Sequence, residues 1–141
     1  MIKTDANKNS LKEIRDRDRK EKEAEIKTMC EAIAVERLGG HEALIKLSNK
    51  HQGIWYLPIM DDEGGIEKMA ILKPIDRHIL SFASTKMEDE GLYIFLEAAM
   101  RQCFHEEFSD MEILDDDKYF LPASGQFNKL IEGKKAFMLK R

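Results

Sequence analysis

The sequence predicts a mostly helical α+β domain, in which one β-hairpin packs against three C-terminal helices and a charged helix precedes them. Aromatic and branched residues flank an acidic, glycine-rich turn in "GIWYLPIMDDEGGIEKMAILK", as expected for a β-hairpin. Apolar residues recur at helical spacing before and after this stretch. With 141 residues, 43% of them hydrophobic, the chain can form one compact core and still carry an extension.

The first expected element is a long helix. From residue 11 to residue 38 the chain holds good helix formers and neither glycine nor proline. Apolar residues form a stripe only in its second half, at Ile26, Cys30, Ile33 and Leu38. The stretch 15–25 offers only Ala24 for burial, so we expect it either to project as a charged helix or to fray. Residues 1–38 are therefore predicted to be a helical extension of a single α+β domain over residues 39–141.

The hairpin is expected over about residues 53–73. The pair Gly39–Gly40 ends the first helix, and a short helix, "HEALIKLS", follows it. The strand "GIWYLPIM", the turn "DDEGG" and the returning strand "IEKMAILK" then make the hairpin. Pro58 removes one backbone donor, which predicts that the first strand is an edge strand or is bulged there.

The first of the three C-terminal helices is expected over about residues 74–87. Pro74 suits its first position, where a missing N–H costs nothing, and Asp76 suits the positive helix start. Its inward residues are Ile75, Ile79, Phe82 and Ala83. Trp55 and Tyr56 could form an exposed platform with Phe82, but burial of all three between hairpin and helix is the favoured interpretation.

The other two helices are expected over about residues 90–106 and 116–139. The first of them has the clearest apolar stripe in the chain: Leu92, Phe95, Leu96, Ala99 and Cys103. The second begins after the acidic "DDD" of residues 115–117, which is typical of a helix N-terminus. Pro122 and Gly125 should kink this last helix or break it into two pieces.

Composition limits the class of protein. No stretch is apolar enough to cross a membrane, and the N-terminus lacks the apolar core of a signal peptide. Cys30 and Cys103 are expected to be reduced core thiols rather than a disulfide, as in a cytosolic protein. A net charge of −4 argues against a dedicated nucleic-acid binder. Acids dominate residues 87–117 and bases dominate residues 118–141, so the two regions could complement each other within one molecule or between copies.

No pattern predicts catalysis, a metal site or a cofactor. The four histidines lack zinc-ligand spacing, and no phosphate-binding loop is present. Ser81 and Ser84 lie near His78, but without a nucleophile elbow or an acidic partner. An enzyme remains open only if the fold gathers His78 with acids from other elements.

From about residue 54 to residue 137 the order of short motifs resembles a family of small phage and prophage proteins. These proteins are encoded among tail genes and are often described as tail assembly chaperone-like. The corresponding residues here are Lys73, Pro74, Arg77, Ser81, Cys103, Phe104, Asp110, Glu112, Ile113, Asp115, Asp116, Phe120, Leu121 and Ser124. On this resemblance, the junction around Pro74 is a signature of the fold rather than a reactive centre.

The resemblance implies a non-catalytic tail assembly factor in the cytoplasm of a bacterial host. Its partner would be a tape-measure or other tail protein, and several copies could act on one client. The alternative is a structural component retained in a virion or phage-like particle, with the N-terminal helix as an assembly arm. Methionine-rich surfaces suit varied clients, although the methionines could equally fill gaps in the core.

The helix over about residues 90–106 is the predicted partner-facing element. Tyr93, Met100 and Phe104 lie off its main apolar stripe and could form an exposed patch. Acids around it, including Asp110 and Glu112, would form a rim that attracts a basic or amphipathic segment. Burial of the three apolar residues between helices is the other interpretation.

Overall fold

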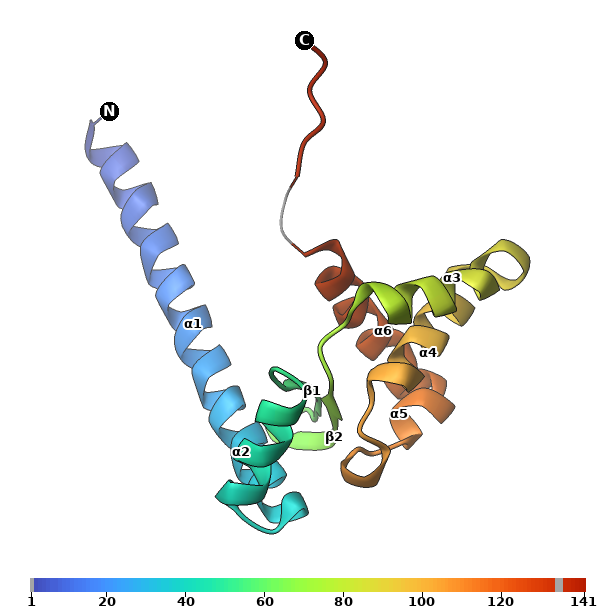
Figure 1. Cartoon of the computed structure of the whole chain (residues 1–141). Coiled ribbons are helices and arrows are strands. Elements are labelled where there is room, and N and C mark those ends of the chain that lie inside the picture. The colour runs from blue at the N-terminus through green and yellow to red at the C-terminus, as the bar shows by residue number, and fades with distance from the viewer. Residues whose placement is uncertain (1, 134–135) are drawn as a thin grey trace.

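A computed structural model describes residues 2–133 and 136–141 and confirms a mostly helical α+β fold (Figure 1). The first half of the chain forms α1 (Ile2–Leu38), α2 (His41–Lys50), β1 (Trp55–Met60) and β2 (Ile66–Leu72). The second half forms α3 (Arg77–Glu90), α4 (Leu92–Cys103), a 3₁₀ turn (Glu106–Phe108), α5 (Glu112–Asp115) and α6 (Asp117–Glu132). The expected hairpin, the short helix after the glycine pair and the charged N-terminal helix are all present.

The β-hairpin lies between two groups of helices and is buried on both faces. β1 and β2 are antiparallel, with Trp55 opposite Leu72 and an irregularity between Ile59 and Met60. Because strand side chains alternate between faces, Ala70 and Leu72 reach one core, and Met69 and Ile71 reach another. The first core is formed with α3 to α6, and the second with α2 and the C-terminal part of α1.

The outer edge of β2 is covered by the segment that follows α4. Phe104 forms an isolated antiparallel bridge with Leu72. The hydrogen bonds are Lys73 N–H to the Cys103 carbonyl (2.8 Å), His105 N–H to the Ile71 carbonyl (2.8 Å), Ile71 N–H to Ser109 Oγ (2.9 Å), Asp110 N–H to the Met69 carbonyl (2.9 Å) and Met69 N–H to Asp110 Oδ2 (2.9 Å). This segment therefore takes the place of a third strand and satisfies the polar backbone of β2.

α1 changes character along its length. Its N-terminal half projects away from the other elements (Figure 1), and Leu11 and Ile14 are exposed there. Its C-terminal part is packed, with Cys30 and Ala34 fully buried. The charged stretch 15–25 is therefore a projecting helix rather than a frayed segment. Cys30 and Cys103 are both free and buried, and burial raises the pKa of the Cys103 thiol to about 12.

The start of α3 differs from the prediction. The helix begins at Arg77 rather than at Pro74, because Asp76 is its cap: Asp76 Oδ1 accepts a hydrogen bond from the Ile79 N–H at 2.8 Å. Pro74 belongs to the connection between β2 and α3. The prediction that Phe82 and Trp55 are core residues is wrong, since they are 48% and 49% exposed. α3 packs mainly on α4, and this contact turns Ile79 and Ala83 inward and leaves Phe82 outside.

The last helix also differs. α6 continues through Pro122 and Gly125 without breaking, and it ends at Glu132 rather than near residue 139. Asp116 caps it and accepts a hydrogen bond from the Lys118 N–H at 3.2 Å. Burial of Phe120, Ala123 and Phe127 holds its inner face on both sides of the proline, and this packing outweighs the lost backbone hydrogen bond.

Candidate functional site

The backbone of β2 shows which groups of the hairpin face outward. Met69 and Ile71 use their N–H and carbonyl groups to bind the 105–110 segment, on the side away from β1. In an antiparallel pair, the backbone groups of successive residues point to alternate sides. Ala70, which lies between these two residues, therefore directs its backbone groups toward β1.

The same alternation identifies an open edge on β1. Leu57 is the register partner of Ala70, so its backbone groups bind β2. Its neighbours Tyr56 and Pro58 consequently direct theirs away from the hairpin. Within residues 2–133 and 136–141 no backbone group pairs with β1 on that side. The edge thus offers the Tyr56 N–H and the carbonyls of both residues, but no N–H at Pro58.

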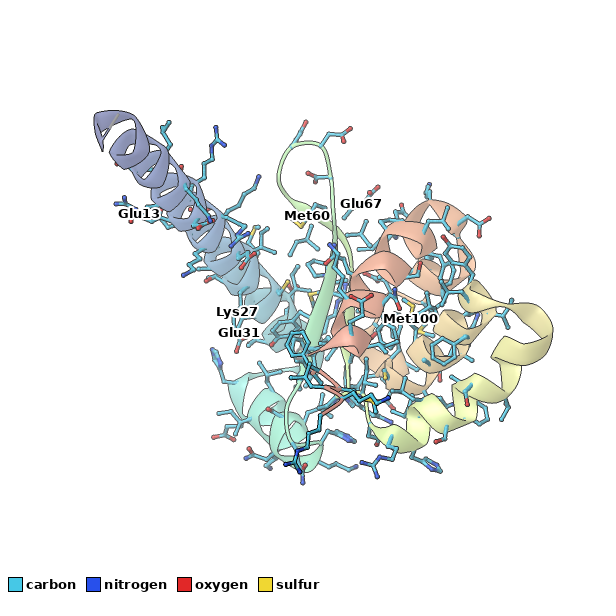
Figure 2. The ribbon with its side chains drawn as sticks, turned by 90° about the horizontal axis from the view of Figure 1, so that it is seen from above. Glu13, Lys27, Glu31, Met60, Glu67 and Met100 are labelled. Carbon is cyan, nitrogen blue, oxygen red and sulfur yellow. The ribbon has the colours of Figure 1, made fainter. Side chains whose placement is uncertain are left out.

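A groove runs along this open edge between α1 and α6. Its floor is β1, and cavities of about 620 and 400 Å³ lie over Trp55, Tyr56 and Pro58. A third cavity, of about 520 Å³, continues over Met60 toward the first half of α6. The walls are Glu23, Ile26, Lys27 and Cys30 of α1 and Tyr119, Pro122, Gln126, Phe127 and Leu130 of α6. We call this feature the edge groove; Figure 2 shows the hairpin between α1, with Lys27 and Glu31, and α6.

Two aromatic residues shape the edge groove. Trp55 lines the cavities of about 620 and 400 Å³ and remains 49% exposed, so much of its ring faces water. Tyr56 is fixed instead: its hydroxyl donates a hydrogen bond to Glu31 Oε2 at 2.9 Å. Burial and the Glu31 carboxylate raise the pKa of Tyr56, so it stays a neutral donor. A half-exposed tryptophan beside a fixed tyrosine is the combination that protein-binding surfaces favour.

The structure does not support the exposed patch expected on α4. Tyr93 is 57% exposed, with its ring edge-on to Phe120 at a centroid distance of 6.4 Å. Met100 and Phe104, however, are 0% and 4% exposed, so the prediction that they face a partner is wrong. α4 packs against α3 on one side and α6 on another, and both sides of the helix are therefore covered. The single apolar stripe recognised in the sequence of α4 predicts one packed side of the helix and not a second.

The two named acids of the predicted rim have different environments in the structure. Asp110 is an internal anchor: its Oδ2 accepts hydrogen bonds from Arg37 at 2.8 Å and from the Met69 N–H at 2.9 Å. Glu112 lies at the surface, where its side chain is 65% exposed and pairs with Lys68 at 3.1 Å. Asp110 therefore joins α1 to β2 and is not free to attract a partner.

The residues that carry the family resemblance do not converge on one site. Lys73 and Cys103 meet through a backbone hydrogen bond, and Arg77 and Ser81 lie exposed on α3. Asp115 accepts a hydrogen bond from Arg101 at 3.0 Å. Asp116 caps α6 and Phe120 is buried, as described above. Pro74 lies in the connection between β2 and α3, so these positions mark junctions of the fold.

A pair of histidines lies outside the groove. The rings of His51 and His105 are 4.8 Å apart, and buried His105 Nε2 has no partner among the described atoms. Burial, and then the neighbouring His51, Lys73 and Lys50, lower the pKa of His105 to about 4. In the described ranges no three histidine, cysteine or acidic side chains are placed to hold a metal ion. Nor does any helix there have the length and apolarity to cross a membrane.

Comparison with known proteins gives no relative: no family model, curated protein or solved structure matches this chain. The edge groove is the candidate binding site of the described residues. Its α6 wall was missed by sequence reasoning, because Gln126 and Leu130 look like ordinary surface and core residues. The signals for its floor were Pro58, which predicted an edge strand, and the single tryptophan three residues before it.

Proposed function

We propose that this protein is a non-catalytic binding protein that holds an apolar segment of a partner protein in the edge groove. The observation that carries the proposal is the edge groove itself, which lies over an unpaired strand edge and is lined by the half-exposed Trp55. Partner segments commonly bind such edges and grooves, where pockets for side chains provide the specificity. Because Pro58 offers no N–H, side chains would contribute more to binding here than a backbone ladder.

The family resemblance supports a specific class of partner. We propose a phage or prophage tail assembly factor that acts in the cytoplasm of the bacterial host on a tape-measure or other tail protein. Such clients expose long apolar segments before assembly, and a groove with aromatic and methionine side chains suits them.

Affinity capture from cells that express the whole gene cluster tests this proposal. Trp55→Ala is expected to lose the captured tail protein. Phe82→Ala is the matched control, because Phe82 has nearly the same exposure, 48% against 49%, but lies on α3 outside the groove. Retention of the partner by Trp55→Ala, or equal loss in both variants, would contradict the proposed site.

A structural role in the particle is the second candidate, and the projecting half of α1 favours it. Leu11 and Ile14 are 55% and 43% exposed, one turn apart, on a helix that reaches away from the domain. An assembly arm would bury them against a neighbouring subunit. Purified particles separate the two functions, since a structural component is present in fixed stoichiometry and an assembly factor is absent.

A further inference from the structure

The last described residues form an exposed apolar run. Phe137, Met138 and Leu139 are 81%, 100% and 89% exposed, and Lys140 and Arg141 follow them. We call residues Ala136–Arg141 the C-terminal segment; Figure 1 shows it extending beyond α6. Three consecutive large apolar side chains left in water indicate a segment that has a binding place elsewhere.

The direction of α6 brings this segment to the edge groove. The start of α6 lies at the Met60 end of β1, where Lys118 and Met60 line the same cavity. Its last turns lie at the Trp55 end, where Leu130 and Trp55 share another cavity. α6 is therefore antiparallel to β1, and the chain leaves it at the Trp55 end of the groove. Gly133 follows with a φ of 55°, a conformation that permits a reversal of chain direction.

We propose that the C-terminal segment folds back into the edge groove of its own chain and occupies it until a partner segment displaces it. The inference rests on the proposed function, because it names the regulation of the same groove. A segment that turns back after α6 runs parallel to β1. Its six residues span at most about 20 Å when extended, which matches the six residues of β1.

The charges at the two ends of the groove favour this direction of the C-terminal segment. With the apolar run over Trp55 to Pro58, Lys140 and Arg141 arrive at the Met60 end of the groove. The turn that follows Met60 carries Asp61, Asp62 and Glu63, and exposed Glu67 lines the cavity there. Lys118 lies at the same end, but the acids outnumber it. The opposite direction would leave the two bases beside Lys129 at the Trp55 end.

The same pattern describes the partner that would compete. A displacing segment is expected to be extended, with large apolar side chains at alternate positions followed by basic residues. Attachment to the same chain gives the C-terminal segment an effective concentration of about millimolar, so weak docking is enough to close the groove and a client of higher affinity can still open it.

Trp55 is the single tryptophan of the chain and reports on the groove directly. The experiment measures acrylamide quenching of its fluorescence in the full chain and in the double variant Phe137→Ser, Leu139→Ser. In an extended segment these two side chains point to one side and Met138 to the other, so Met138→Ser is the matched control. We expect about a twofold rise in quenching in the double variant, since the docked population is lost, and little change in the control.

Equal quenching in all three proteins would overturn the inference. Protection that disappears on dilution would also overturn it, because docking would then join two copies. A synthetic peptide of residues 136–141, added to the double variant, should restore protection. If quenching is the same in all variants while capture of a partner still depends on Trp55, only the self-docking inference fails. If capture is also independent of Trp55, the proposed function fails as well.

Discussion

Arg37 is expected to be the most sensitive polar residue in the described structure. Its guanidinium donates hydrogen bonds to the carbonyls of Met69 (3.0 Å) and Phe108 (2.9 Å) and to Asp110 Oδ2 (2.8 Å). One side chain at the end of α1 thus joins β2 to the segment that covers its edge. Arg37→Ala removes these bonds together and leaves the Asp110 carboxylate with the Met69 N–H.

The size of the loss follows from the contacts and their exposure. Hydrogen bonds to a charged group contribute about 1.5–3 kcal/mol each when buried. The side chains of Arg37 and Asp110 retain 28% and 31% exposure, so water replaces part of what is lost. We therefore expect Arg37→Ala to lower the free energy of unfolding by about 2–3 kcal/mol in total, measured by urea denaturation.

Arg101→Ala is the matched control. Arg101 pairs with two carboxylates, those of Glu97 and Asp115, each at 3.0 Å, but its side chain is 44% exposed. Its loss should cost less than about 1 kcal/mol. A double-mutant cycle of Arg37→Ala with Asp110→Asn should give a coupling energy of about 1–2 kcal/mol. If Arg37→Ala is no more destabilising than Arg101→Ala, the anchor has no special role and this reasoning is wrong.

Three further outcomes are expected. Phe82→Ala should cost about 1 kcal/mol or less, whereas Ile79→Ala, at a buried position of the same helix, should cost about 2–4 kcal/mol in urea denaturation; equal losses would contradict the assigned faces of α3. Stability should fall by on the order of 3 kcal/mol as the pH drops from 6.5 toward 4, because the folded state lowers the pKa of His105 and the unfolded state takes up the proton first. His105→Phe should flatten that slope, and an unchanged slope would assign it to other groups. A chain lacking residues 1–23 should unfold within about 1 kcal/mol of the full chain, since residues 10–25 bury almost nothing; a larger loss would indicate that α1 packs on a second subunit.

The elements of the fold were predictable where one local signal was strong. Alternating branched and aromatic residues around "DDEGG" specified the hairpin, and Gly39 ended α1. Local signals failed where tertiary contacts compete with them. Pro122 breaks an isolated helix, but the buried residues before and after it hold α6 together. Pro74 resembles a helix start, yet Asp76 caps the helix with its side chain, and two valid N-terminal signals stood two residues apart.

The candidate site was less predictable than the fold. Met100 and Phe104 were expected to be exposed because a single periodic stripe accounts for only one packed side of a helix, and α4 has more than one. Trp55 was expected to be buried, since large aromatic residues usually are. Trp55 instead lies in a groove between α1 and α6, and neither local periodicity nor composition contains the placement of these two helices around β1.

The two edges of the hairpin show why the groove is open on one side only. β2 has no proline, so its outward N–H and carbonyl groups could pair with a strand of another chain. Residues 103–110 prevent this pairing, because their backbone, hydroxyl and carboxylate groups bind those of β2. β1 carries Pro58, which already prevents a continuous ladder, and it can remain uncovered without inviting strand-to-strand aggregation. An edge that is protected from a ladder but lined with apolar side chains favours reversible binding of one segment, as the proposed function requires.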